Sequence, residues 1–228
     1  MKMAGVTLLA SDLTILKRFY RDRLELPVLS EEEHAFTITA GATKLTFSQA
    51  EAGAQPYYHF AFNVSTSRMD SAVRWLGAQG IEVFTEEGSA VVHSERWNSD
   101  QVYFHDPAGN IVELIVRHTL PGETEEDYHP RHVLNVSEVG LPADDVPELA
   151  GLLTGRLEEG VYLSGTDTFT PIGDEEGLLI LVRTGRIWFG SDRQAAVYPV
   201  RIELEREGMA ELQLLSYPYY LRTGTVNS

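Results

Sequence analysis

The stretch Gln101–Val116, QVYFHDPAGNIVELIV, decides how this chain folds, because it joins two apolar strands by a tight turn. The turn is Asp106–Asn110, DPAGN, in which the proline presets φ and the final Gly-Asn tolerates a positive φ. In the strand that follows, side chains alternate between two faces, so Glu113 lies among isoleucines on one of them. A carboxylate in this position needs a chemical reason, which makes Glu113 the first candidate functional residue.

An earlier stretch, His59–Val64, HFAFNV, shows the same two-residue alternation. Phe60 and Phe62 share one face of this predicted strand, which leaves His59 on the other face. A histidine and a glutamate therefore project from two strands of one segment.

These features resemble the vicinal oxygen chelate superfamily, which includes glyoxalase I, extradiol dioxygenases, fosfomycin-resistance enzymes and metal-free bleomycin-binding proteins. In that superfamily a βαβββ module opens with a strand whose first residue is often a metal-binding His. It closes with Asp-Pro-x-Gly-Asn and a strand carrying a metal-binding Glu. The resemblance covers residues 3–117 and implies an α+β fold, in which βαβββ modules pair into an open, cup-shaped mixed sheet with helices outside. It also implies that His59 and Glu113 bind a metal.

Composition narrows the classes of function. The formal charge of −16 repels phosphate backbones and anionic lipids, so we expect neither nucleic acid nor a membrane as partner. No apolar run approaches the ~20 residues of a membrane helix and the N-terminus does not resemble a signal peptide, which predicts a cytoplasmic protein. Without cysteine, a metal must be held by His and carboxylate groups, which suits Mn, Fe, Ni, Co or Zn.

The strand-helix-strand-strand-strand pattern recurs along the chain. A first copy begins near Gly5, and a second begins at His59 after the short connection Glu51–Pro56. Because a short connection favours neighbouring modules, we expect both copies to form one cup within residues 1–117.

Beyond this pair the pattern is weaker. Residues 118–132 are acidic and contain proline, which predicts a linker between domains. Residues 133–228 predict a degenerate third module at the C-terminus, with an additional strand at Leu212–Tyr220.

The superfamily places two metal ligands on each module, and the first copy lacks both. Its opening position is Gly5 and its late-strand position is Thr46, neither of which binds divalent metals well. An alternative pairs the second copy with the third, within one chain or across a homodimer. That pairing adds Glu138 and Glu203 to the candidate metal ligands His59 and Glu113.

Other residues are candidates for contacts with a small-molecule ligand. Arg96 and Trp97 lie on a loop that can close over a ligand, and Tyr103 offers an aromatic face beside it. The resemblance implies a metal-dependent enzyme that binds adjacent oxygens of its substrate through an oxyanion or enediolate, with Glu113 as the catalytic base. The alternative is a metal-free, antibiotic-sequestering protein whose aromatic cup attracts a cation.

Overall fold

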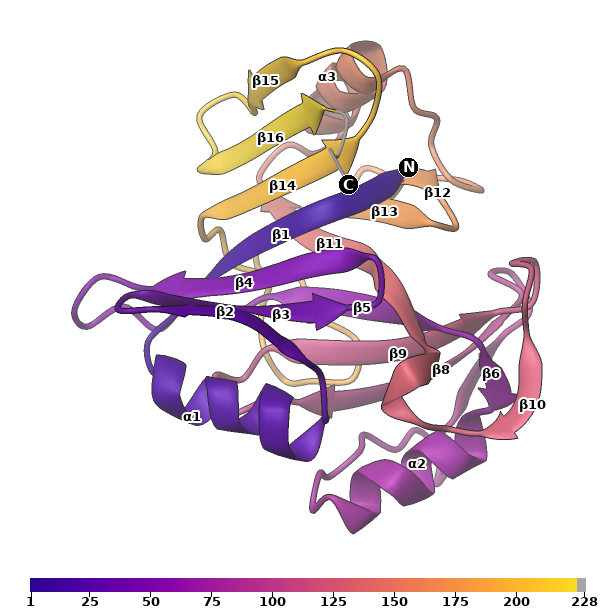
Figure 1. Ribbon diagram of the computed structural model, residues 1–228. Helices are drawn as coiled ribbons and strands as arrows, with labels where there is room; N and C mark the ends of the chain where they lie inside the picture. The colour runs from indigo at the N-terminus through magenta and orange to yellow at the C-terminus, as the bar shows by residue number, and fades with distance from the viewer. Residues whose placement is uncertain (225–228) are drawn as a thin grey trace.

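The computed structural model describes residues 1–224 and is built around two seven-stranded mixed sheets (Figure 1). The first sheet has the strand order β15-β16-β14-β1-β4-β3-β2, so it combines strands from both ends of the chain. Its strands are β1 (Lys2–Ala10), β2 (Val28–Glu32), β3 (Ala35–Ala40), β4 (Thr43–Gln49), β14 (Val200–Glu205), β15 (Ala210–Gln213) and β16 (Tyr219–Gly224).

The second sheet has the order β12-β13-β11-β5-β9-β8-β7 and comes from the middle of the chain. Its strands are β5 (His59–Val64), β7 (Val92–Ser94), β8 (Ser99–His105), β9 (Ile111–Arg117), β11 (Val133–Ala143), β12 (Phe169–Asp174) and β13 (Gly177–Arg183).

Each sheet is a pair of modules joined edge to edge. Within each module the opening strand runs parallel to the last one: β1 to β4, β5 to β9, β11 to β13 and β14 to β16. The modules join through the antiparallel pairs β1–β14 and β5–β11. The predicted α+β fold of paired βαβββ modules in curled mixed sheets is confirmed.

The expected partners within residues 1–117 are wrong, because the first two modules do not share a cup. β1 and β5 belong to different sheets, and each takes its antiparallel neighbour from beyond residue 132. A short connection keeps two modules close in space, but it does not decide which strand edges form hydrogen bonds. The single C-terminal module predicted over residues 133–228 is divided between the sheets: β11 to β13 join the second sheet, whereas β14 to β16 complete the first. The additional strand predicted at Leu212–Tyr220 is wrong, because the chain turns within this range and forms the antiparallel pair β15 and β16.

Three α-helices within the described residues follow the opening strands of the first three modules. They are α1 (Leu13–Arg18), which continues as the π-helical turn η1 (Phe19–Arg23), α2 (Met69–Ala78) and α3 (Val146–Leu157). Asp12 caps α1 by accepting the backbone N–H of Ile15, and Asp145 caps α3 in the same way. Residues 206–209, which connect β14 to β15, contain no helix, so the fourth module is the most reduced.

The predicted linker 118–132 is not a free connection. It contains β10 (Thr124–Asp127), which pairs in parallel with β6 (Thr66–Arg68), and the 3₁₀ turn η2 (Pro130–His132). The ring of Tyr128 also packs against Trp75 of α2. Residues on both sides of this segment share the second sheet, so the predicted boundary does not separate two units in space.

The main core lies between the apolar faces of the two sheets and the helices. Phe47 of β4 meets Phe60 of β5 across it, and Tyr20 of η1 stacks on Phe47. Because side chains alternate along a strand, His59 and Glu113 face away from this core. Within residues 1–224 no helix has the length and apolar character needed to cross a membrane.

Candidate metal centre

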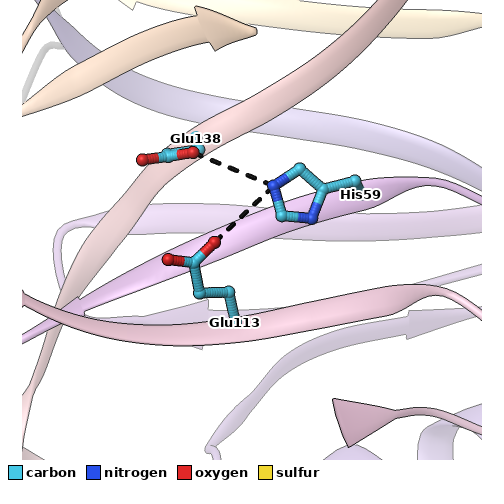
Figure 2. A group of neighbouring side chains, drawn as sticks. All are labelled: His59, Glu113 and Glu138. Carbon is cyan, nitrogen blue, oxygen red and sulfur yellow. Dashed lines mark ion pairs between the residues drawn. The ribbon is translucent and has the colours of Figure 1, made fainter. Parts of the chain in front are cut away.

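Three ionisable side chains meet on the face of the second sheet opposite the main core (Figure 2). His59 Nε2 lies 3.7 Å from an oxygen of Glu113 and 3.8 Å from an oxygen of Glu138. All three residues are buried, and one donor atom from each lies within 4.8 Å of the others. The structure thus brings together the predicted pair and one of the two alternative ligands.

The pairing of three neighbouring strands brings these side chains together, and Ala61 lies opposite both glutamates. Ala61 of β5 pairs with Glu113 of β9 on one side and with Glu138 of β11 on the other. His59 precedes Ala61 by two positions and therefore shares its face. Three adjacent strands in the middle of the sheet consequently fix the group.

The turn that opens β9 holds this register. Oδ1 of Asp106 accepts hydrogen bonds from the backbone N–H groups of Ala108 and Asn110, at 2.9 and 3.0 Å. Its other oxygen accepts from the Tyr20 hydroxyl at 2.7 Å, which anchors the turn to η1. Gly109 has φ = +78°, a conformation that glycine adopts without strain, which explains why the turn motif has glycine at this position.

The geometry fits a divalent ion. Ligand atoms bound at about 2.1 Å from one metal lie roughly 3.0–4.2 Å apart, and the two distances from His59 fall in that interval. The other ring nitrogen, Nδ1, lies 3.2 Å from the carbonyl oxygen of Ile111. A proton on Nδ1 would be donated to that carbonyl, leaving Nε2 as the free donor toward the carboxylates.

The surroundings of the two carboxyl groups shift their pKa values in opposite directions. Burial and the nearby charge of Glu138 raise the pKa of Glu113 well above its ordinary value. For Glu138, burial acts in the same direction, but His59 and Arg117 outweigh it and the pKa is lowered. In the absence of a metal, a proton on this pair is therefore favoured on Glu113, and the ionised form is favoured on Glu138.

The fourth ligand position of this module pair is apolar. In the second module the glutamate lies opposite Ala61, two residues after His59. The equivalent residue of the third module lies opposite Gly140, two residues after Glu138, and it is Ile180. A bound ion would consequently have three side-chain ligands and a side free for substrate or water.

The first sheet does not reproduce the site. Its corresponding positions include Gly5 and Thr46, as predicted, and the alternative ligand Glu203 lies on β14. Glu203 is exposed and pairs with Gly5, so it belongs to the other sheet and not to the group around His59.

A cavity of about 350 Å³ opens onto the three side chains. Of the residues predicted to contact a ligand, Trp97 and Tyr103 line it, whereas Arg96 is exposed and does not. Burial, followed by the charges of Glu113 and Glu138, raises the pKa of Tyr103, so its hydroxyl keeps its proton.

The cavity also contains aromatic residues that the sequence did not identify. Trp188 packs against the imidazole of His59 with ring centres 4.9 Å apart, and Phe189 contacts Tyr103 at 5.1 Å. Both belong to the irregular connection 184–199 between β13 and β14, which has no periodic pattern to place it. Their aromatic character was the available signal, although it does not by itself indicate which face they cover.

Comparison with known proteins identifies the family. The family model described as Glyoxalase/Bleomycin resistance protein/Dioxygenase superfamily matches residues 2–114. Through these residues the chain belongs to that superfamily. No curated protein matches the sequence.

Solved structures extend the likeness in fold over the whole chain. A candidate dioxygenase from Bacillus subtilis superposes with a TM-score of 0.66 over 99% of this chain and 85% of its own, at 14% identity. A glyoxalase I mutant from Zea mays superposes with a TM-score of 0.60 over 97% of this chain and 93% of its own, also at 14% identity. At such low identities these matches establish a shared fold and no shared reaction.

Proposed function

We propose that this protein is a divalent-metal-dependent enzyme that acts on a small substrate through two adjacent oxygen atoms. The supporting observation is the convergence of His59, Glu113 and Glu138 from three strands, with donor atoms within 4.8 Å of one another. A buried histidine between two buried carboxylates is a donor set for Mn, Fe, Co, Ni or Zn. Family membership agrees with this proposal.

The chemistry divides between the ion and the protein. A divalent ion would supply electrophilic stabilisation of the negative charge that develops on the substrate oxygens. His59, Glu113 and Glu138 would hold it, and the side beside Ile180 would remain free for the substrate. In its ionised form Glu113 is suited to a second task, because a carboxylate whose pKa is raised is a stronger base and can take up a proton from carbon.

The walls of the cavity support a reaction protected from bulk water. Trp97 and Trp188 line the same cavity as the three ionisable side chains and give it apolar walls. Tyr103 presents a protonated hydroxyl close to Glu113. A low-polarity enclosure strengthens the electrostatic interactions within it.

Metal binding is testable by thermal unfolding with Mn, Fe(II), Co, Ni and Zn. At a hundredfold excess over Kd, a metal that binds only the native state adds about 2.7 kcal/mol, which corresponds to roughly 5–10 °C in a chain of this size. His59→Ala, Glu113→Ala and Glu138→Ala should abolish this increase. Glu203→Ala is the matched control and should retain it. A wild-type protein that responds to none of these metals would refute the proposal.

Proton abstraction needs a separate assay. We expect the metal-loaded protein to exchange carbon-bound hydrogen of an α-hydroxycarbonyl substrate for solvent deuterium, as followed by NMR. Glu113→Gln should suppress this exchange, because an amide cannot accept the proton.

The aromatic cavity supports a second candidate, a metal-free protein that binds small molecules. Trp97, Trp188 and Tyr103 offer flat faces to a planar or cationic ligand. In that case aromatic cations, and none of the metals, would raise the melting temperature.

A further inference from the structure

Arg117 occupies the inner face of the second sheet beside the candidate metal centre. It is the last residue of β9 and shares a face with Glu113, from which it is four residues distant. Its side chain has no exposed surface, and the indole of Trp97 lies 5.4 Å from the guanidinium carbon. A fully buried arginine is rare unless it is paired with an acid.

That acid is Glu138. Arg117 Nη2 contacts Oε1 of Glu138, while the other oxygen, Oε2, is the one that lies 3.8 Å from His59 Nε2. The two oxygens of this carboxylate therefore face different partners. One is occupied by the guanidinium, and one faces the histidine.

The guanidinium is fixed on its other side. Arg117 Nε donates to Oδ1 of Asn63 at 3.2 Å. The amide of Asn63 donates to the carbonyl of Glu175 at 2.9 Å, which orients its oxygen toward Arg117. Asn63 lies on β5, the strand that begins with His59, so this chain of contacts links the histidine strand to Glu138.

The arrangement is not one that fold stability alone explains. Nη1 of Arg117 is buried and has no hydrogen-bond partner among the described residues, which costs free energy. A pair of well-packed apolar residues in place of a buried ion pair is often neutral or stabilising. A buried arginine with an unused donor is more consistent with a role in the site.

We propose that Arg117 is a positioning residue for metal binding: it holds one oxygen of Glu138 so that this residue presents a single oxygen beside His59. The inference rests on the metal site proposed above. Glu138 then acts as a one-oxygen ligand whose direction is set before the metal arrives. Without Arg117 the carboxylate can rotate, pair with Glu113 through a shared proton, or bind the metal with both oxygens.

Calorimetric titration with Ni²⁺ and Co²⁺ tests this role. Residues that orient a metal ligand typically contribute 10–100-fold to affinity, so Arg117→Met should weaken both metals at least tenfold. Arg117→Lys keeps the charge and can reach one oxygen, so it should recover part of the loss. Arg206→Met is the control for removing one positive charge, because Arg206 pairs with Glu158 and Glu159 away from the site.

A spectroscopic readout separates orientation from a general loss of stability. The visible spectrum of bound Co²⁺ reports the number and arrangement of its ligands, and it should change in Arg117→Met under saturating metal. If Arg117→Met does not fold, Asn63→Ala provides the same test, because it removes the acceptor that fixes Arg117 and keeps the charge. Asn135→Ala is its control, since Asn135 contacts Asn63 but not Arg117.

The outcomes distinguish the two proposals. A wild-type protein that binds neither ion removes the metal site itself. A wild-type protein that binds both ions, with unchanged or tighter binding and an unchanged Co²⁺ spectrum in the Arg117 and Asn63 variants, overturns the role of Arg117 and leaves the metal site intact.

Discussion

Replacement of Gly140 by alanine should destabilise the protein through Trp188. A Cβ at Gly140 would lie 2.6 and 2.9 Å from two carbons of the indole, whereas carbon atoms in contact are normally about 3.5–4.0 Å apart. The ring would have to move by roughly 1 Å, away from its packing on His59. Overpacking of this kind costs about 1–3 kcal/mol.

A double-mutant cycle in urea, with chelator present, measures whether the indole is the cause. Trp188→Ala alone should cost about 3–5 kcal/mol through lost burial. In that background Gly140→Ala should cost less than about 1 kcal/mol, because the remaining close neighbour of the new Cβ is the backbone oxygen of His59 at 3.3 Å, giving a coupling energy of about 1–2 kcal/mol. Gly151→Ala, on α3 with open space around it, is the control and should be stabilising. Equal costs of Gly140→Ala in both backgrounds would refute the steric explanation.

Three further predictions concern the site and the sheet contacts. The raised pKa of Glu113 means that the folded metal-free protein keeps a proton that the unfolded chain loses above pH 4.5, so its stability falls as pH rises toward the folded-state pKa. Glu113→Gln should remove this fall, and urea unfolding between pH 5 and pH 8 with chelator would show a growing advantage over wild type. Ile180→His should place a donor at the fourth ligand position and tighten Ni²⁺ binding roughly tenfold, about 1.4 kcal/mol, in a calorimetric titration; unchanged affinity would contradict the inferred register. Gly41→Ala should lower the free energy of unfolding by at least about 2 kcal/mol, because Gly41 has φ = +57° and a Cβ would lie 2.0 Å from the carbonyl oxygen of Leu134; a near-neutral effect in urea would show that this turn can move.

The sequence was sufficient for features that depend on local pattern. The turn Asp106–Asn110 and the alternation around it predicted β8, β9 and the inward direction of Glu113. The same alternation placed His59, and the missing ligands at Gly5 and Thr46 correctly indicated that the first module does not complete a site. Local chemistry decides these features, because turn residues and strand parity act over a few positions.

Features that depend on strand partners could not be read in the same way. Glu138 became part of the group only because β11 pairs with β5, and the short connection between the first two modules favoured a different pairing. Glu203 shares strand parity with a ligand position, but β14 pairs with β1 in the other sheet. Arg117 was missed because the strand was predicted to end at Val116, and a terminal arginine is usually exposed. Edge-to-edge pairing arises from whole modules and leaves no short-range signature.

The pairing of the first module with the fourth, and of the second with the third, sets an order in which the protein can be completed. Thr7 of β1 pairs with Arg201 of β14, and most of the chain separates these two residues. Ala61 of β5 pairs with Glu138 of β11, which is separated from it by only about a third of the chain. During synthesis the second sheet, with all three candidate ligands, can close while β1 still presents an unpaired edge. Long-range pairing of this kind slows folding, and an open edge invites association with other chains. The outer pair of modules is therefore the part of this molecule most exposed to misassembly, and the part whose completion should limit the rate of folding.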